Sequence, residues 1–482
     1  MKTNTSTQLE QFRLAVYHSF ARRADASMVL LDALTGNTTA GSVVELSLAP
    51  GFRRTYSSVY AAVGECFIVT KAAQRRHWEQ LLLRLVALRL APPSRRKFWL
   101  FGIDATSVSR IFAPTLPDRG YVHCANPIGG NKPITLGHQY SLLAYLPDKL
   151  PECEPAWIAP LLWRRISSQE SELAVAVAQI EALLADARLP FHNELCVQVE
   201  DSRYSTPAFL HPVVQHTNLV TIARLRGTRT LYRQAPPDAA QPRRAGHPRW
   251  YGARFALHAP KTWGPPAQCA ATTCISRRGH TYTVQIEAWH DLLLRGTRDY
   301  AMHAEPLTLV RIRLLDAQGQ PAFKRDLWLG VFGDRRRALT LLDIRQAYLQ
   351  RYDLEHFFRF GKQRLLLTDF QTPDIERETN WLQLVQLAYV QLYLARSLAT
   401  PSTRPWERYL PSRPAAPATP AATQRAFAEI IRPLGTPAAA PKRRGIPPGR
   451  AAGAQPKPRP RYAVVKKTPA AAKKPPNQPQ TG

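Results

Sequence analysis

The sequence predicts an α/β protein in which helices flank a mixed sheet. Two apolar runs, residues 98–103 and 195–199, have the bulk and length of buried strands, and acidic residues follow each of them. Residues 171–189 and 380–398 carry apolar side chains at three- and four-residue spacing, which predicts amphipathic helices. Several runs within residues 281–332 alternate with period two, as strands do. A chain of 482 residues exceeds the usual single core, so more than one unit is expected.

Changes in pattern along the chain divide it into five segments. They are a helical N-terminal segment (1–95), the first part of the α/β core (96–234), a β-rich insertion (235–335), the C-terminal helices of the core (336–400) and a tail rich in Pro, Ala, Lys and Arg (401–482). The first segment is either a plain helical bundle or a DNA-binding domain, because arginines lie opposite its apolar faces. The tail buries too little apolar surface to order itself, so we expect disorder, either as a DNA-scanning arm or as a simple solvated tail.

The charge of the chain points to a polyanionic partner. Lys and Arg number 65 against 35 Asp and Glu, a net charge of +30. The tail holds 16 basic and 2 acidic residues, so the first 400 residues keep +16 of the +30. The N-terminus lacks a signal-peptide core and no run reaches the roughly 18 apolar residues of a membrane span, so we expect a cytoplasmic protein without a membrane partner.

Other classes of site find little support. The six cysteines are scattered without histidines at ligand spacing, which argues against zinc. The stretch GGNKP at 129–133 lacks the pattern of a phosphate-binding loop, so no nucleotide cofactor is expected. No G-x-S-x-G sequence supports a hydrolase triad.

One polar stripe stands out in YLQRYDLEHFFRFGKQRLLL, residues 348–367. Tyr348, Arg351, Glu355 and Lys362 lie at offsets 0, 3, 7 and 14. At about 100° per residue, all four would project within about 60° of one another on a continuous helix. A carboxylate between cations and a phenol is the layout expected for a metal-binding acid flanked by phosphate contacts.

Two further acids follow the predicted strands. Asp104 ends the first apolar run, and Glu200 and Asp201 end the second. Acids at the carboxyl ends of adjacent parallel strands meet at one edge of a sheet, where a late helix can bring Glu355. Asp104, Asp201 and Glu355 would then hold two divalent ions, Mg²⁺ or Mn²⁺, for phosphoryl transfer on DNA. Taken singly, an acid after a strand is more often a turn or cap residue.

Neighbouring acids compete for two of these positions. Adjacent strand residues face opposite ways, so only one of Glu200 and Asp201 can point into the site. Asp353 is rotated by about 200° from Glu355 on a helix, and so falls off the stripe. The geometry favours Glu355.

These stretches resemble bacterial insertion-sequence transposases of the DDE superfamily, which have a ribonuclease H-like core. The likeness rests on the signature Y-x2-R-x3-E-x6-K, which residues 348–362 fit without a gap, and on GIDATSVSR and VEDSRYS around the first two acids. It spans roughly residues 96–398. It implies that Asp104, Asp201 and Glu355 are metal ligands and that Tyr348, Arg351 and Lys362 contact phosphates near the cleaved end.

The resemblance also implies an activity and partners. Such enzymes bind terminal inverted repeats, free a 3′-hydroxyl at each transposon end and transfer it into target DNA, acting as a dimer or higher multimer in the bacterial nucleoid. Members with a β insertion can hold a flipped base on a tryptophan there; Trp263 and Trp289 are the candidates, although a strand tryptophan is more often core.

Several arginines and one lysine near the acids are candidates for a DNA channel. They are Arg110, Arg119, Lys132 and Arg203, some of which will be ordinary ion-pair partners. Two rival functions stay open: a nuclease of the same core that cuts without strand transfer, and a catalytically inactive DNA-binding regulator derived from a transposase.

Overall fold

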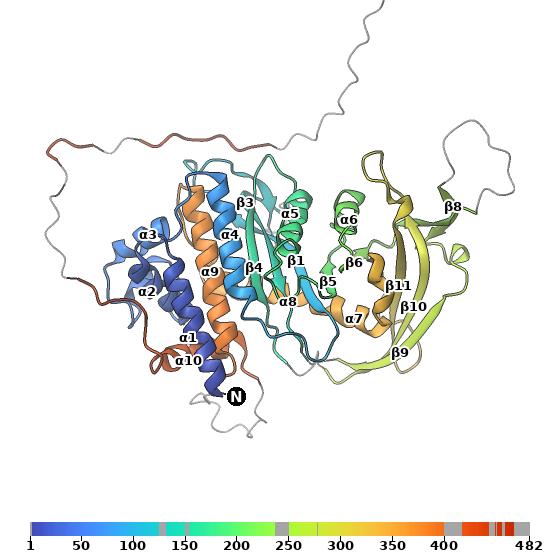
Figure 1. Cartoon of the computed structure of the whole chain (residues 1–482). Helices are drawn as coiled ribbons and strands as arrows, with labels where there is room; N and C mark the ends of the chain where they lie inside the picture. Colours follow the sequence, from blue (N-terminus) through green and yellow to red (C-terminus); the bar gives the residue numbers. More distant parts are fainter. Residues whose placement is uncertain are drawn as a thin grey trace, which may run out of the picture.

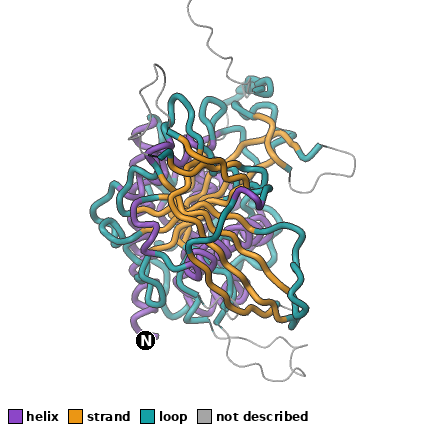
Figure 2. Tube along the Cα trace, turned by 90° about the vertical axis from the view of Figure 1, so that its right-hand side faces the viewer, coloured by secondary structure: helices purple, strands orange, loops and turns teal. Residues whose placement is uncertain are grey.

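The computed structural model describes residues 2–124, 132–149, 154–236, 250–276, 278–399, 417–442, 449, 451–455 and 458–466. One large sheet runs through the molecule, with helices packed at one end and along its faces (Figure 1). A view turned by 90° shows the strands gathered at the centre (Figure 2). No helix within the described ranges is both long and apolar enough to cross a membrane.

The sheet contains twelve strands among the described residues, in the order β2-β3-β1-β5-β6-β12-β11-β10-β7-β8, with β4 paired to β3 and β9 to β10. The strands are β1 (Trp99–Ser109), β2 (Gly120–His123), β3 (Ile134–Tyr145), β4 (Ala159–Ile166), β5 (Cys196–Glu200), β6 (Leu219–Leu225), β7 (Thr230–Gln234), β8 (Tyr251–Ala256), β9 (Gln268–Ile275), β10 (Thr281–Leu294), β11 (Pro306–Leu315) and β12 (Leu327–Phe332).

Five of these strands form a ribonuclease H-like core. In the order β4-β3-β1-β5-β6, the first three are antiparallel to one another and β1, β5 and β6 are parallel. The predicted fold class, a mixed sheet flanked by helices, is confirmed. The predicted insertion does form strands, and it extends this same sheet, because β12 pairs antiparallel with β6.

The helices are α1 (Lys2–Ser19), α2 (Ala24–Thr35), α3 (Tyr56–Glu65), α4 (Ala72–Ala87), α5 (Glu172–Leu184), α6 (Pro207–Val213), α7 (Leu341–Gln350), α8 (Tyr352–Arg364), α9 (Ile375–Ala395) and α10 (Pro420–Ile431). Helix α9 is buried on all sides from Glu378 to Ala395. It contacts β4 as well as α1, α2, α3 and α10, so it has no solvent face (Figure 1). The N-terminal helices therefore share one hydrophobic core with the sheet.

The tail differs from its prediction. The expectation that all of 401–482 is disordered is wrong for residues 420–431, which form α10 and bury Phe427 completely. An apolar face on this short stretch, hidden in a Pro/Ala-rich background, is what allows it to pack on α9. Farther along, Val465 forms a parallel bridge with Gly120 at the edge of the sheet. Residues 400–416 and 467–482 lie outside the described part of the chain.

Candidate active site

Asp104 and Asp201 lie level with each other on neighbouring parallel strands. Strands β1 and β5 pair in register up to Gly102 opposite Val199. Two residues further along each strand come Asp104, inside β1, and Asp201, directly after β5. Since side chains two residues apart share a face of a strand, both carboxylates leave the sheet on the same side. Each is oriented by a nearby amide: Asp104 Oδ1 accepts from the Ala105 nitrogen at 2.8 Å, and Asp201 Oδ1 from the Arg203 nitrogen at 2.7 Å.

Glu355 comes from α8, and the predicted single helix is in fact two. Helix α7 ends at Gln350 and α8 begins at Tyr352. The residue between them, Arg351, keeps helical dihedral angles, but the amides of Arg351 and Leu354 bond three residues back instead of four. Tyr348 therefore belongs to α7, and Glu355 and Lys362 to α8. Helix α8 crosses β1 closely, since a Cβ on Gly102 would meet Leu354 at 2.9 Å.

The guanidinium of Arg351 lies among the predicted acids. Its Nη1 donates to Asp104 Oδ2 at 3.2 Å and its Nη2 to Glu355 Oε1 at 3.1 Å. Burial lowers the pKa of Arg351, but the charges of Asp104, Glu355 and Asp201 outweigh burial and raise that pKa. Burial raises the pKa of Tyr348, which Arg351 partly offsets. Arg351 is thus the shared ion-pair partner of Asp104 and Glu355.

Asp104 is an acid of this group whose pKa is clearly shifted. Its pKa is raised to about 6: burial is the largest cause, Arg351 and the Ala105 amide lower the pKa, and the charges of Asp201 and Glu172 raise it. A carboxylate partly withdrawn from water beside other carboxylates is a position that a cation stabilises. The pKa shift therefore has a cause that a metal ligand would share.

Lys362 lies half-buried two turns beyond Glu355, and burial lowers its pKa. No hydrogen bond or ion pair joins it to the three acids within the described residues. Its expected contact with a phosphate stays a prediction.

Sequence reasoning missed Glu172, the first residue of α5. Its carboxylate is buried, pairs with Arg203 Nε at 2.8 Å and accepts from Gln139 Nε2 at 2.9 Å. Its charge raises the pKa of Asp104, so it faces the site. An acid in the first turn of a helix is so common that no pattern in the sequence distinguishes Glu172.

The two competing acids have other environments. Glu200 is fully buried, burial raises its pKa well above the usual range, and neither carboxylate oxygen has a partner within the described residues. Asp353 pairs with Lys149 at 2.6 Å. Neither residue is hydrogen-bonded to Arg351, which contacts Asp104 and Glu355 instead.

The predicted channel residues lie in different settings. Arg110 is buried and pairs with the buried Glu378 at 2.6 Å, and Arg119 is buried with its guanidinium on the carbonyl oxygens of Arg110 and Ile111. Both guanidinium groups are buried and make contacts inside the protein, so neither offers a positive charge at the surface. Lys132 and Arg203 are exposed, and Arg203 pairs with Glu172.

Both candidate tryptophans pack inside the insertion. Trp289 is buried and donates to the Gly264 carbonyl at 3.2 Å; Trp263 is half-buried and donates to the Ala256 carbonyl at 2.8 Å. The Arg311 guanidinium covers the Trp263 ring at 4.7 Å from its centroid. These contacts are those of a packed core, the more common role of a strand tryptophan.

The carboxylates suit a hard divalent ion, because they offer several oxygens, and the raised pKa of Asp104 marks a position where positive charge is favoured. As arranged around Arg351, however, no three His, Cys, Asp or Glu side chains of the described residues are close enough together to hold a metal ion. Arg351 supplies the positive charge instead. For an ion to bind there, the Arg351 guanidinium would have to move away from the carboxylates.

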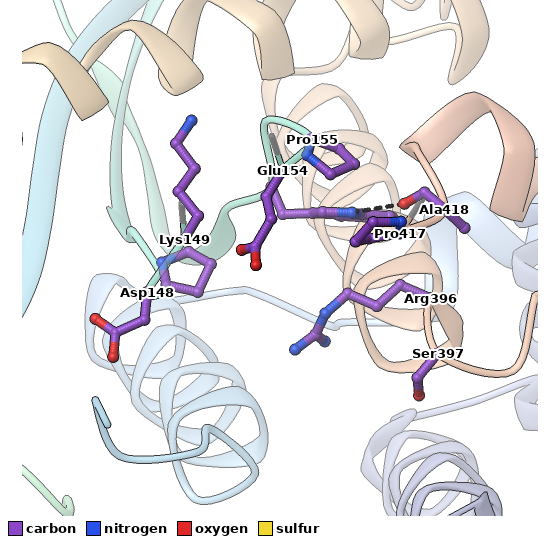
Figure 3. A pocket seen from close by; sticks show the side chains of 10 residues that line it. Asp148, Lys149, Glu154, Pro155, Arg396, Ser397, Pro417 and Ala418 are labelled. Carbon is purple, nitrogen blue, oxygen red and sulfur yellow. Dashed lines mark hydrogen bonds between the residues drawn. The ribbon is translucent and has the colours of Figure 1, made fainter. Parts of the chain in front are cut away.

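A separate pocket of about 320 Å³ lies at the end of β3, lined by Asp148, Lys149, Glu154 and Arg396 among others (Figure 3). Residues 147–149 follow Tyr145, which pairs with Phe101 near the start of β1. The pocket thus lies near the start of β1, whereas Asp104 is in the middle of that strand. Its charges are of both signs, and no candidate acid lines it.

Acidic side chains on and directly after neighbouring parallel strands of a ribonuclease H-like sheet, in a strongly basic chain, are typical of nucleases. The chain belongs to the DDE superfamily endonuclease family, whose model matches residues 15–293. The match covers Asp104 and Asp201 and ends before α8. A comparison with curated proteins found no match.

Proposed function

We propose that the chain is a DNA transposase that cleaves transposon ends and joins their 3′-hydroxyls to target DNA. The observation that carries the proposal is that the Arg351 guanidinium bonds both Asp104 and Glu355, while Asp201 follows the parallel strand next to that of Asp104, in a member of a DDE endonuclease family. Acids this far apart in sequence have no structural need to gather at one cation. A common cation site explains why they do.

Each residue has a distinct task in this proposal. When bound, two Mg²⁺ or Mn²⁺ ions would activate the attacking water or 3′-hydroxyl and neutralise the leaving oxygen. Asp104, Asp201 and Glu355 would hold the ions. Arg351 would then leave the carboxylates and turn toward a DNA phosphate, and Tyr348 on α7 and Lys362 on α8 would contact phosphates on either side of it.

The partners follow from the chemistry. The substrate is DNA, and the net charge of +30 favours its approach. Joining two ends in concert calls for at least a dimer. A nuclease that cuts without joining is the rival that the family description fits equally well.

Incubation of the purified protein with labelled duplexes from the DNA flanking its gene, and with Mg²⁺, tests the proposal. Cleavage and joining should be lost in Asp104→Asn, Asp201→Asn and Glu355→Gln while DNA binding persists. Glu181→Gln, on the exposed side of α5, is the matched control and should stay active. Cleavage without joining would select the nuclease, and normal cleavage by Glu355→Gln would overturn the assignment of the third acid.

A further inference from the structure

A pocket of about 410 Å³ opens directly beside Asp201. It is lined by Ser202, Arg203, Thr206, Arg226, Thr228, Arg229 and Thr230. Three of these residues are arginines and the other four carry hydroxyl groups. None is acidic and none is aromatic.

The fold explains why this pocket adjoins the acids. Strands β5 and β6 are parallel, with Glu200 opposite Ala223. The residues that follow each strand therefore leave the sheet at the same edge. Asp201 to Thr206 follow β5, while Arg226 to Arg229 form the turn between β6 and β7, so the turn lies next to the loop that carries Asp201.

The turn concentrates positive charge, and within the described ranges no acidic side chain pairs with its two arginines. Arg203, outside the turn, is already paired with Glu172. Arg226 is exposed and has no ion pair in the described part of the chain, and the guanidinium of Arg229 donates to the carbonyl and hydroxyl oxygens of Ser205, at 2.9 and 3.3 Å. The pKa of Arg229 is lowered by burial and then by the charge of Arg226, so the two guanidiniums repel each other. An anion between them would relieve that repulsion.

The chemistry of the lining selects the anion. Guanidinium groups and hydroxyls are the donors that bind phosphate oxygens, and carboxylates, which would repel a phosphate, are missing from the lining residues. A nucleotide would also need a surface on which its base could stack, and none of the lining residues is aromatic. The pocket therefore suits a phosphodiester of a longer strand better than a free nucleotide.

We propose that Arg226, Arg229 and the hydroxyls around them bind a backbone phosphate of the DNA that occupies the active site. The inference rests on the proposed function, and it adds a contact that positions the strand beside Asp201. Because a backbone phosphate carries no base identity, the contact contributes affinity and register without sequence preference.

Fluorescence anisotropy of a labelled DNA duplex, titrated with protein at several salt concentrations, tests the pocket. The variant Arg226→Gln should reduce the slope of log affinity against log salt by about 0.9 and weaken binding roughly fivefold at physiological salt. Thr228→Asp places a carboxylate in the pocket and should weaken binding further. Arg432→Gln, at the end of α10, is the matched control, because that exposed arginine lies with the N-terminal helices (Figure 1).

The outcomes separate the pocket from the function on which it rests. If wild type cleaves DNA but Arg226→Gln and Thr228→Asp keep its salt slope, the pocket assignment is overturned and the proposed function stands. If wild type does not bind DNA, both are overturned. A rise in melting temperature with inorganic phosphate over chloride at equal ionic strength, lost in Arg226→Gln without any change in DNA binding, would assign the pocket to free phosphate and overturn the DNA contact.

Discussion

Arg351 donates a hydrogen bond to Asp104 across a sequence separation of 247 residues, at 3.2 Å, and to Glu355 with its other terminal nitrogen. The side chain is largely buried, with 15% of its surface exposed. This one guanidinium links β1 to α8 and balances the carboxylates that we propose as metal ligands. A cation of the protein itself therefore joins the two elements at this site.

Replacement of that cation should make the fold depend on metal. Arg351→Gln should lower the free energy of unfolding by about 1.5–3 kcal/mol without metal, because hydrogen bonds to charged groups are lost. Mg²⁺ should restore more stability to this variant than to wild type, since the ion replaces the missing charge. Urea denaturation with and without Mg²⁺ measures both effects. Arg359→Gln, exposed on α8, is the control, and an equal response to Mg²⁺ in all three proteins would contradict the prediction.

Metal binding should weaken in acid. The pKa of Asp104 is raised to about 6, so a proton competes with the metal below that value and not above it. Apparent Mn²⁺ affinity, measured by calorimetry, should reach a plateau above about pH 7 and fall as much as tenfold per pH unit below about pH 6. Affinity that stays constant down to about pH 5 would show that the Asp104 carboxylate is not a ligand.

The charged Asp104 carboxylate should also lower the free energy of unfolding at neutral pH. Its pKa is higher in the folded protein than the ordinary value of 3.8, so the folded state disfavours the charged form. The cost is fully present above about pH 6 and absent below about pH 4. Asp104→Asn should therefore raise the free energy of unfolding at pH 7 by on the order of 2 kcal/mol, and by far less at pH 4. Thermal unfolding at both pH values measures this, with Glu181→Gln as the control; an equal or lower stability at pH 7 would refute it.

Arg110 should act on stability and not on DNA. It shares Glu378 with His138 and Tyr140, and the Arg110 and Glu378 side chains are completely buried. Arg110→Ala leaves a buried carboxylate without its main counter-ion and should cost roughly 3–5 kcal/mol. Chemical denaturation measures that loss, with Arg432→Ala as the control. The opposite result would be an Arg110→Ala protein that is as stable as wild type but whose DNA affinity depends less steeply on salt, by the equivalent of one phosphate contact. That result would show that Arg110 contacts DNA.

The strands that carry Asp104 and precede Asp201 could be predicted because local patterns determine them, although the expected end of the first strand at Asp104 is wrong and β1 continues to Ser109. An apolar run ended by an acid located β1, β5 and the level positions of Asp104 and Asp201. The stripe from Tyr348 to Lys362 was found by helical spacing, although its helix breaks at Arg351. A single residue with helical dihedral angles between two helices leaves no mark in periodicity.

Long-range pairing explains what the sequence did not reveal. The burial of Arg110 depends on Glu378, which is 268 residues away. The proximity of Glu172 to Asp104 and of the 226–229 turn to Asp201 depends on strand order. The order of α10 depends on contacts with α9. None of these partners is implied by the residues beside them in the chain.

Mn²⁺ binding in the presence of a DNA duplex, followed by electron paramagnetic resonance, tests the central claim most directly. Wild type should bind two ions, and Asp104→Asn, Asp201→Asn and Glu355→Gln should each lose at least one, while Glu181→Gln binds as wild type does. Unaltered Mn²⁺ binding by any of the three variants would contradict the claim that these carboxylates form one metal site.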